Sequence, residues 1–389
     1  MHFVFVSSLV PVQSPASGYD IANRVIVDAI SLLGHRVSVI GFLQPGHAPA
    51  APGDTHVLGR REVTNARVSK AQKALWLKDA FVHGEPVSVA KMHAASPVEI
   101  TAVLAATGAI DGLILNSVQL PGAFLDIFRA WPCLFVAHNV EARSAADNAK
   151  AAADPLTRYL FARDARLLAR LERALSAASR HVFTLAEADR AELGVGEDRS
   201  SVLPLVTSVT PPEGPAERAP LYDAGMIGSW TWAANRAGLD WFLAEVAPLL
   251  PADFRIGIAG GTGGSAPPAP ANVDFLGRVD DARDFVRSCR VIPLISRTGT
   301  GVQLKTIETF EMGLPSVATA NALRGIARPP ANCVSAEEPA AFAAALVDLV
   351  TRSRAGEALD LDGRVFHAGQ LEGLGQALAR GLACCGGQG

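Results

Sequence analysis

Residues 291–318 read VIPLISRTGTGVQLKTIETFEMGLPSVA and contain a strand, a glycine-rich turn, a helix and a second strand in succession. The run 291–295 is short and apolar, as is typical of a buried parallel strand, and 302–312 has the spacing of an amphipathic helix. A further strand is expected at 316–318. Parallel strands joined by a crossover helix build α/β folds, so this segment predicts a parallel sheet covered by helices.

The same alternation of strand and helix patterns extends along most of the chain. Further strands are expected at 2–7, 36–41, 112–115, 133–137, 181–184, 201–203, 224–228 and 255–259. Helices are expected at 19–33, with Gly34 as the C-terminal cap, and at 235–250, 281–288 and 339–350. Alternating patterns of this kind predict doubly wound parallel sheets.

A proline-rich stretch at 204–220 shows neither period and predicts a linker. The sequence therefore predicts an α/β protein with two Rossmann-like, doubly wound domains that face each other across a cleft. The expected parts are an N-terminal domain at 1–205, a hinge at 206–220, a C-terminal domain at 221–365, and a helix or tail at 366–389 that packs back toward the first domain. Open α/β sheets bind ligands at the carboxyl ends of their strands, which is where the cleft would lie.

Composition excludes several classes of protein. Of the 389 residues 49% are apolar and 19% are charged, which argues against disorder and coiled coils. The formal net charge of −3 provides no overall basic field, so no nucleic-acid partner is expected. The five cysteines show no C-x-x-C spacing, and the apolar start at 1–12 is too short to span a bilayer and lacks a basic leader. A cytoplasmic protein is expected.

The turn between the 291–295 strand and the following helix has the features of an anion site. Gly299 and Gly301 let the backbone approach a ligand, and the helix directs free amides and its positive end toward the same point. Lys305 lies in the first turns, and Glu308 lies one turn deeper on a similar face, where a carboxylate can accept hydrogen bonds from ribose hydroxyls. Phosphate beside ribose indicates a nucleotide.

Three other kinds of turn resemble this one in part. It could be a plain strand-to-helix turn, with Lys305 and Glu308 as a surface ion pair. A P-loop requires glycine directly before the lysine, and Leu304 stands there. The dinucleotide fingerprint requires a third glycine that this turn lacks.

The run 299–319 resembles the donor-binding signature of the group 1 (family 4) glycosyltransferases. The segment GSWTWAAN at 228–235, followed by Trp241-Phe and by EVAP at 245–248, resembles the start of the C-terminal domain in that family. AHNVE at 137–141 is similar to its acceptor-side motif, and GHRV at 34–37 to its first helix-to-strand step. The resemblance implies the GT-B fold and a glycosyltransferase that acts in polysaccharide or glycoconjugate biosynthesis. It also implies retention of anomeric configuration and no metal ion.

Family roles transfer to matching positions of this sequence. A nucleotide-diphosphate-sugar would serve as donor substrate on the C-terminal domain, with no further cofactor. The residues implied in donor binding are Ser229, Gly299, Thr300, Gly301, Val302, Gln303, Lys305 and Glu308. The residues implied on the acceptor side are Gly18, Tyr19, His138, Asn139 and Glu141. His138 and Lys305 are the implied catalytic residues, His138 beside the transferred sugar and Lys305 at the diphosphate.

The sequence departs from the family at one position and leaves two alternatives open. Many members carry a glutamate eight residues before the ribose glutamate, and here Thr300 stands there. A catalytically silent nucleotide-sugar-binding protein is therefore one alternative. A nucleotide-sugar 2-epimerase is the other, and it would need additional acid and base carboxylates. Asn139 and Glu141 could instead cap the next helix.

Two further features concern surfaces and packing. The helix at 156–173 carries five arginines among apolar residues, which is typical of helices that lie on anionic membranes, although an ordinary solvated face has the same pattern. Peripheral contact with the inner face of the membrane is therefore one expectation, and a glycan, lipid-linked or small-molecule acceptor is expected. Trp230 and Trp232 could stack on a ligand or pack in the core.

Overall fold

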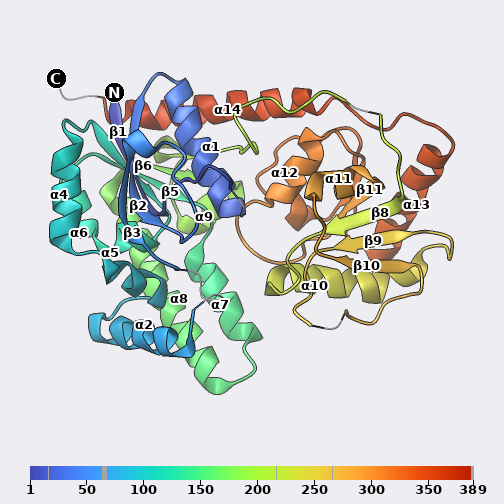
Figure 1. The fold of residues 1–389 in the computed structure, drawn as a ribbon, viewed down its shortest axis with the longest axis horizontal. Helices are drawn as coiled ribbons and strands as arrows, with labels where there is room; N and C mark the ends of the chain where they lie inside the picture. The colour runs from blue at the N-terminus through green and yellow to red at the C-terminus, as the bar shows by residue number, and fades with distance from the viewer. Residues whose placement is uncertain (16, 64–67, 216, 265, 387–389) are drawn as a thin grey trace. The chain divides into compact units, whose positions relative to one another are not determined.

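The computed structural model describes residues 1–15, 17–63, 68–215, 217–264 and 266–386. The chain forms two compact units. Unit 1 comprises Met1–Val209 together with the chain from Glu372 onward, and unit 2 comprises Thr210–Leu371. Each unit contains one parallel sheet with helices on both faces (Figure 1). The prediction of an α/β protein with two doubly wound sheets is confirmed.

Unit 1 is built on a seven-stranded sheet with the order β3-β2-β1-β4-β5-β6-β7. Every strand pairs in parallel with its neighbours. The strands are β1 (His2–Leu9), β2 (Arg36–Leu43), β3 (Thr55–Arg60), β4 (Gly112–Asn116), β5 (Cys133–Ala137), β6 (Ser179–Thr184) and β7 (Ser200–Val202). This order reverses between β1 and β4, as in Rossmann folds.

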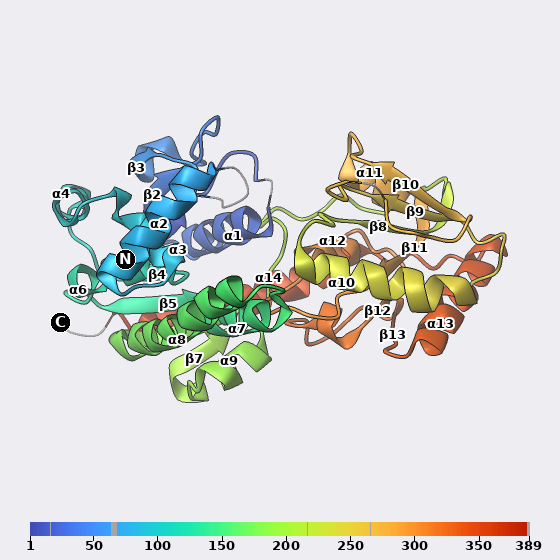
Figure 2. The ribbon, with the colours of Figure 1, turned by 90° about the horizontal axis from the view of Figure 1, so that it is seen from below.

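The helices of unit 1 cover both faces of this sheet. They are α1 (Gly18–Leu32), α2 (Lys70–His83), α3 (Val87–Ala90), α4 (Pro97–Thr107), α5 (Gln119–Ala123), α6 (Leu125–Phe128), α7 (Glu141–Ala151), α8 (Pro155–Ala178) and α9 (Glu187–Leu193). Short 3₁₀ turns occur at Pro52–Asp54, Lys91–Ala94 and Glu197–Arg199. Helix α7 runs beside α8 (Figure 2).

Local sequence explains where α1 begins and ends. Ser17 and Asp20 form a reciprocal capping box, in which each side chain accepts a hydrogen bond from the other residue's backbone amide. Gly34, directly after the cap residue Leu33, has φ +81°, a conformation that glycine adopts at little cost. The predicted cap therefore lies where the chain turns into β2.

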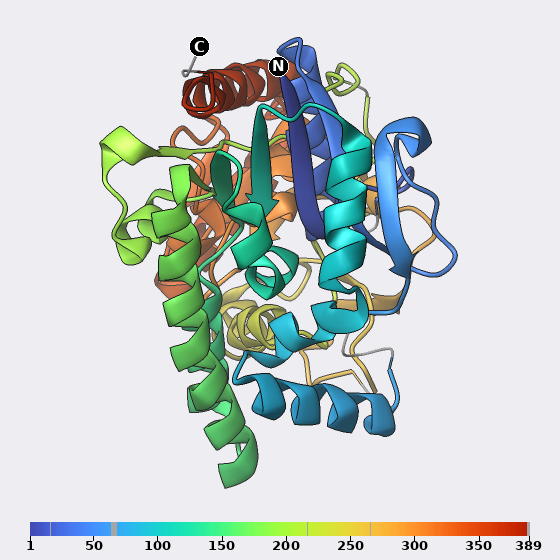
Figure 3. The same cartoon turned by 90° about the vertical axis from the view of Figure 1, so that its left-hand side faces the viewer.

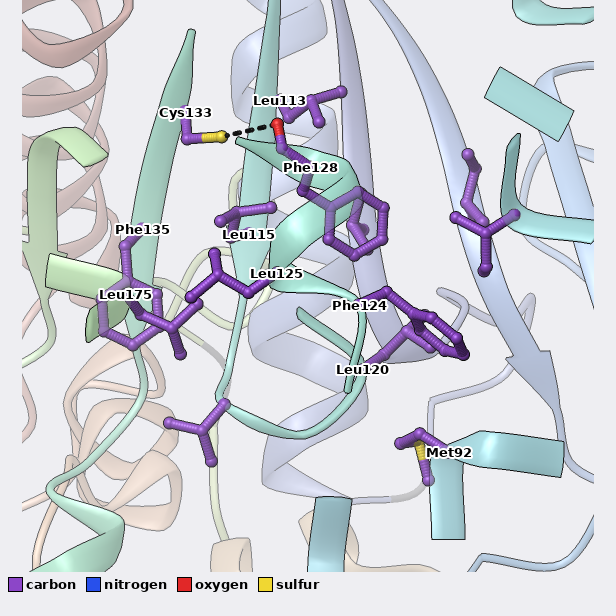
Figure 4. Close-up of a cluster of buried hydrophobic side chains, with 14 of the residues drawn as sticks. Met92, Leu113, Leu115, Leu120, Phe124, Leu125, Phe128, Cys133, Phe135 and Leu175 are labelled. Carbon is purple, nitrogen blue, oxygen red and sulfur yellow. Dashed lines mark hydrogen bonds between the residues drawn. The ribbon is translucent and has the colours of Figure 1, made fainter. Parts of the chain in front are cut away.

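One hydrophobic core of unit 1 lies between the sheet and the helices α4 to α8. Alternate strand residues such as Leu113, Leu115 and Phe135 are fully buried against Phe128 and Leu175 (Figure 4). Burying side chains of this size contributes roughly 1.5–3 kcal/mol each. The core also holds Cys133, whose Sγ lies 3.3 Å from the carbonyl oxygen of Phe128.

The end of α14 (Gly363–Ala383) packs on the opposite face of the unit 1 sheet. Gly381 approaches Phe183 and His181 of β6 so closely that a Cβ atom would lie 2.2 Å from the phenylalanine ring. Arg380 donates a hydrogen bond to the carbonyl of Glu197 at 2.8 Å. These contacts fix the last part of the described chain to unit 1.

Unit 2 contains a six-stranded parallel sheet with the order β10-β9-β8-β11-β12-β13. The strands are β8 (Tyr222–Ile227), β9 (Ile256–Ala259), β10 (Val273–Gly277), β11 (Cys289–Leu294), β12 (Ser316–Ala318) and β13 (Cys333–Ser335). The order reverses between β8 and β11, so unit 2 repeats the topology of unit 1. Within 203–221, the described residues form neither helix nor strand.

The helices of unit 2 differ in part from the sequence expectation. They are α10 (Ala233–Trp241), α11 (Ala282–Arg287), α12 (Leu304–Glu311) and α13 (Pro339–Arg354), with a 3₁₀ turn at Ala320–Leu323. The expected helix at 235–250 changes type after α10, becoming a π-helical turn at Phe242–Val246 and a 3₁₀ turn at Ala247–Leu249. Pro248 has no amide hydrogen to continue the α-helical hydrogen bonds.

Candidate nucleotide-sugar site

In unit 2 the loops that follow β8 and β11 lie side by side, because these two strands are neighbours in the sheet. The strand order reverses at this point, and open α/β sheets bind ligands at the carboxyl ends of strands at such a reversal. Two glycines allow the close packing. A Cβ on Gly238 of α10 would lie 2.2 Å from the carbonyl oxygen of Ile295, and one on Gly260 would lie 1.9 Å from that of Gly228.

Hydrogen bonds from the segment after β12 support the glycine-rich loop from Ile295 to Gln303. Gly299 and Gly301 have φ values of +104° and +74°, which explains why glycine occupies both positions. The Asn321 amide donates to Ser296 Oγ at 2.9 Å and to the Thr298 carbonyl at 3.1 Å. Asn321 follows β12, and the sequence analysis did not identify it, since a single asparagine after a strand carries no distinctive pattern.

Lys305 is half-buried in the first turn of α12. Its Nζ lies 3.5 Å from Asn235 Oδ1 and 5.9 Å from the centroid of the Trp230 ring. Burial lowers the pKa of Lys305 to about 8. Within the described residues no carboxylate lies within 4 Å of this ammonium group, so the charge has only neutral neighbours.

Glu308 lies one turn further along α12 and lines the same pocket as Lys305 and Trp230. Its Oε1 lies 3.1 Å from Arg283 Nε, and both of these side chains are exposed to solvent. Lys305 and Glu308 therefore do not form the surface ion pair that was one interpretation of the sequence. The carboxylate has an exposed partner that a ligand could displace at little cost.

The segment after β8 brings Ser229 into the same region. Asn235 donates from Nδ2 to the Ser229 carbonyl at 3.0 Å, while its Oδ1 faces Lys305. Asn235 thus connects two predicted donor-binding residues, and sequence reasoning did not assign it a role. Trp230 is 1% exposed and donates from Nε1 to the Ala259 carbonyl, so it packs in the core and does not stack on ligands.

The other residues of the predicted donor loop have varied surroundings. Gln303 is buried and precedes α12, but its side chain does not cap the helix. Thr300 and Val302 are half-buried in the loop. The expected helix at 302–312 therefore begins two residues later than predicted, and the amides of its first turn are left without a side-chain cap.

Unit 1 has a polar cluster at the equivalent reversal of its sheet. Ser7 at the end of β1 is paired in register with Asn116 at the end of β4. The Asn116 amide group lies 3.1 Å from Ser7 Oγ and 2.8 Å from Asn23 Oδ1. The Tyr19 hydroxyl lies 3.1 Å from Ser7 Oγ and 3.0 Å from Ser8 Oγ. Of this cluster the sequence analysis identified only Tyr19.

His138 follows β5 and joins this cluster. Its Nε2 lies 2.7 Å from Asn116 Oδ1, and its ring packs on that of Tyr19 with centroids 5.0 Å apart. Burial lowers the pKa of His138 to about 4, so the imidazole is neutral at physiological pH. The structure thus brings together His138 and Tyr19, two of the predicted acceptor-side residues.

The remaining acceptor-side residues lie at the starts of helices. Gly18 is the first residue of α1, Asn139 is half-buried after β5, and Glu141 is the first residue of α7. Neither Asn139 nor Glu141 caps α7. The buried Glu172 carboxylate of α8 accepts a hydrogen bond from the Glu141 amide at 2.6 Å instead, and burial raises the pKa of Glu172 to about 7.

The comparison with protein families identifies the part of the chain that holds this site. Residues 222–352 match the family model of the group 1 glycosyl transferases. Unit 2 carries a group 1 glycosyltransferase domain. The resemblance that the sequence motifs indicated is confirmed, and the protein is a glycosyltransferase. A search of curated proteins finds no significant match.

Solved structures resemble the chain over nearly its whole length. Sucrose-phosphate synthase from Thermosynechococcus elongatus is 16% identical with a TM-score of 0.63, over 98% of this chain and 96% of that one. HepE from Anabaena, in a complex with UDP, is 13% identical with a TM-score of 0.58, over 98% and 100%. WaaG, a glycosyltransferase involved in lipopolysaccharide biosynthesis, is 15% identical with a TM-score of 0.57, over 99% and 100%. At these identities the likeness shows the GT-B fold.

The described residues offer neither a cluster of metal ligands nor a membrane-spanning helix. No group of three or more His, Cys, Asp or Glu in the described residues is arranged to hold a metal ion. Asp360 and Asp362, which are spaced as in a D-x-D motif, instead pair with Arg218 and Arg364. Among the helices of the described chain none is both long enough and apolar enough to cross a membrane.

Proposed function

We propose that this glycosyltransferase moves a sugar from a nucleoside diphosphate sugar to a hydroxyl group of an acceptor. The observation that carries the proposal is Lys305, a half-buried ammonium group that contacts Asn235 and the Trp230 ring and has no carboxylate within 4 Å among the residues that the structure describes. A cation without a counter-ion in a low-dielectric site favours binding of an anion. No side chain caps the first turn of α12, so the positive end of this helix also favours an anion there.

The diphosphate lies against Lys305 and the loop from Gly299 to Gly301 in this proposal. Cleavage of the glycosyl–phosphate bond leaves negative charge on the departing nucleoside diphosphate. Lys305 and the helix amides stabilise that charge in the transition state, so the reaction proceeds without a metal ion. Family resemblance supports transfer with retention of anomeric configuration.

Glu308 accepts hydrogen bonds from the ribose hydroxyls, and the ligand displaces Arg283 from its carboxylate. Both Glu308 and Lys305 line one pocket, with Ser229 held nearby through Asn235. A uridine nucleotide is the first donor to test, because HepE, which has a similar fold, is described in complexes with UDP and with UDP-glucose.

Unit 1 supplies the acceptor side, with Gly18, Tyr19, Asn139 and Glu141 near the acceptor and His138 beside the transferred sugar. Because the imidazole of His138 is neutral, it can form hydrogen bonds with hydroxyl groups and does not attract anions from the solvent. The acceptor hydroxyl belongs to a glycan, a glycolipid or a small molecule.

The test is a donor screen with the purified full-length protein. Thermal stability and donor hydrolysis are measured with UDP-, GDP-, ADP- and dTDP-sugars, with and without a chelator. One nucleotide that raises the melting temperature, with slow hydrolysis that survives chelation, is the expected result. No stabilisation by any nucleotide would overturn the proposal. Stabilisation without transfer to any acceptor would support a silent nucleotide-sugar-binding protein, the alternative raised by Thr300.

A second proposal concerns α8 as a peripheral membrane contact. Arg163, Arg166 and Arg170 line a hollow beside Gly84, and Leu156 and Tyr159 are exposed on the same helix. The N-terminal half of α8 extends beyond the sheet of unit 1 (Figure 3). Basic side chains attract anionic headgroups while apolar ones enter the interface.

Sedimentation with anionic and with neutral vesicles tests this contact. Binding to anionic vesicles alone, weakened by salt and by Arg166→Glu with Arg170→Glu, is expected. Arg163 is left unchanged because it donates hydrogen bonds to the carbonyls of Ala80 and Glu85 and thereby fixes α2 to α8. Absence of binding to anionic vesicles would overturn the contact.

A further inference from the structure

A chain of hydrogen bonds at the end of β4 determines which nitrogen of His138 carries a proton. The chain begins at the Leu9 carbonyl, which can only accept hydrogen bonds. Asn23 Nδ2 lies 3.4 Å from that oxygen, so the amide group of Asn23 faces Leu9 and its Oδ1 faces away.

The orientation of Asn23 sets that of Asn116. Asn23 Oδ1 accepts a hydrogen bond from Asn116 Nδ2 at 2.8 Å, which leaves Asn116 Oδ1 directed at His138. The distance from Asn116 Oδ1 to His138 Nε2 is 2.7 Å. Because an amide oxygen only accepts, Nε2 must carry the hydrogen.

The surroundings prevent this series of hydrogen bonds from reversing its direction. Asn23 and Asn116 are 1% and 0% exposed, so water cannot replace a lost partner. Ser7 Oγ accepts a second hydrogen bond from Asn116 Nδ2 at 3.1 Å. Turning either amide over would place two oxygens, or two amide groups, face to face, and buried unsatisfied groups cost roughly 1–3 kcal/mol each.

We propose that Asn23 and Asn116 are positioning residues that hold His138 in the Nε2–H tautomer and keep Nδ1 available as an acceptor for a substrate hydroxyl. This role rests on the proposed function. Nδ1 has no hydrogen-bond partner among the residues that the structure describes. A free neutral imidazole exchanges between two tautomers, and only one of them presents an acceptor at Nδ1. With the tautomer fixed, Nδ1 is already an acceptor before the substrate binds.

Nitrogen-15 NMR of histidine-labelled protein reads the tautomer directly, without donor or acceptor. The His138 signals are assigned by their loss in His138→Gln. A pure Nε2–H tautomer is expected in the wild type, and a mixture in Asn116→Leu and in Asn23→Leu. Asn23→Leu is the sharper variant, because Asn23 acts on His138 only through Asn116.

Matched controls separate this effect from misfolding. Ser7→Ala removes one acceptor from Asn116 but leaves the amide chain intact, so the tautomer is expected to stay fixed. The signals of His181, whose Nε2 lies 2.9 Å from the Ser201 hydroxyl, should not move in any variant. A wild-type mixture, an Nδ1–H tautomer, or an unchanged tautomer in Asn116→Leu would overturn the proposal.

Activity then tests whether the fixed tautomer matters. Asn23→Leu is expected to lower the transfer rate about tenfold, the value of one hydrogen bond, while the affinity for the nucleoside diphosphate in unit 2 stays unchanged. A fixed wild-type tautomer with unchanged transfer in Asn23→Leu would overturn the positioning role. Failure of the proposed function would instead appear as absent nucleotide binding, with the NMR result unaffected.

Discussion

The two sheets reverse their strand order at equivalent points, yet the chemistry at those points is opposite. At the end of β1 and β4, Asn116 forms hydrogen bonds with both Ser7 and His138, and burial keeps the imidazole neutral. At the end of β8 and β11, Lys305 is a charge that has no carboxylate within 4 Å in the part of the chain that the structure describes. The same backbone topology therefore serves one preorganised neutral site and one site that lacks a counter-ion.

This difference indicates how stability and function are divided. A satisfied polar network stabilises the fold before any ligand is present, whereas an uncompensated buried charge costs stability until an anion binds. Substitutions in unit 1 should therefore appear first in folding measurements, and those in unit 2 first in binding and transfer.

The largest expected effect is that of Lys305→Met, which keeps the length of the side chain and removes its charge. We expect the transfer rate to fall roughly 100- to 1,000-fold, as when one group that stabilises transition-state charge is removed. The thermal stability of the free protein should not fall, because a half-buried charge without a counter-ion is lost. Steady-state kinetics and thermal unfolding of both proteins check this.

The matched variant is Lys305→Arg, which keeps the charge but changes its shape. Nucleotide binding should survive in Lys305→Arg and weaken in Lys305→Met. Equal transfer by the wild type and Lys305→Met would remove Lys305 from the catalytic role.

The second prediction concerns acid stability and His138. The pKa of His138 is about 4 in the folded protein and near its usual value in the unfolded chain. As pH falls from 7, the unfolded chain takes up a proton before the folded protein does, so stability is lost by roughly 3 kcal/mol between pH 7 and pH 4. Unfolding by urea at several pH values measures this loss.

The control is the variant His138→Gln. The quantity to compare is the change in its free energy of unfolding with pH, not its absolute stability. This variant should lose less stability between pH 7 and pH 4 than the wild type. Burial lowers the pKa of His181 to about 4 as well, and its contribution is present in both proteins and cancels in the comparison. If the free energy of unfolding changed equally with pH in the wild type and in His138→Gln, a neutral, buried His138 would be contradicted.

Sequence patterns predicted the central strands of both units and the helices α1, α8 and α10 to α13, because their apolar periods are long. The strands β3, β10 and β13 were missed. All three lie at the edges of their sheets and contain polar or exposed residues such as His56, Asp274 and Val334, so their alternation is weak. The break in the predicted helix at 235–250 depends on hydrogen bonding around Pro248, which a period of apolar residues does not reveal.

The sequence offered candidate site residues where a local motif exists, and it offered none where the partners come from distant parts of the chain. The glycine turn, Lys305 and Glu308 form a local pattern, and the structure places them at one strand end. Asn116, Asn235 and Asn321 are single amides after strands or in a helix. Their importance comes from contacts across 22, 70 and 25 residues of sequence, which no local spacing encodes.

The third prediction uses Glu308→Gln. A charged acceptor of ribose hydroxyls contributes about 2 kcal/mol, so nucleotide affinity should fall roughly 30-fold. The control is Arg283→Ala, which removes the exposed partner of Glu308 and leaves the carboxylate in place. Calorimetric titration should show affinity unchanged or slightly increased in Arg283→Ala. A loss in both variants would mean that the ion pair, not the carboxylate alone, supports the site.

The smallest predicted effect is the pH dependence of nucleotide affinity, which distinguishes the charged Lys305 site from the neutral His138 site. Lys305 has a pKa of about 8 in the free protein, and a bound diphosphate raises that pKa because it favours the ammonium form. As pH rises above 8 the free site loses its proton, so nucleotide affinity should fall about fivefold between pH 8 and pH 9. Titration of nucleoside diphosphate from pH 7 to pH 9.5 measures this slope.

Lys305→Met and Lys305→Arg should both give flat profiles, since neither side chain loses a proton in this range. His138 is already neutral throughout the range, so a residual slope in Lys305→Arg would assign the titration to another group of unit 2.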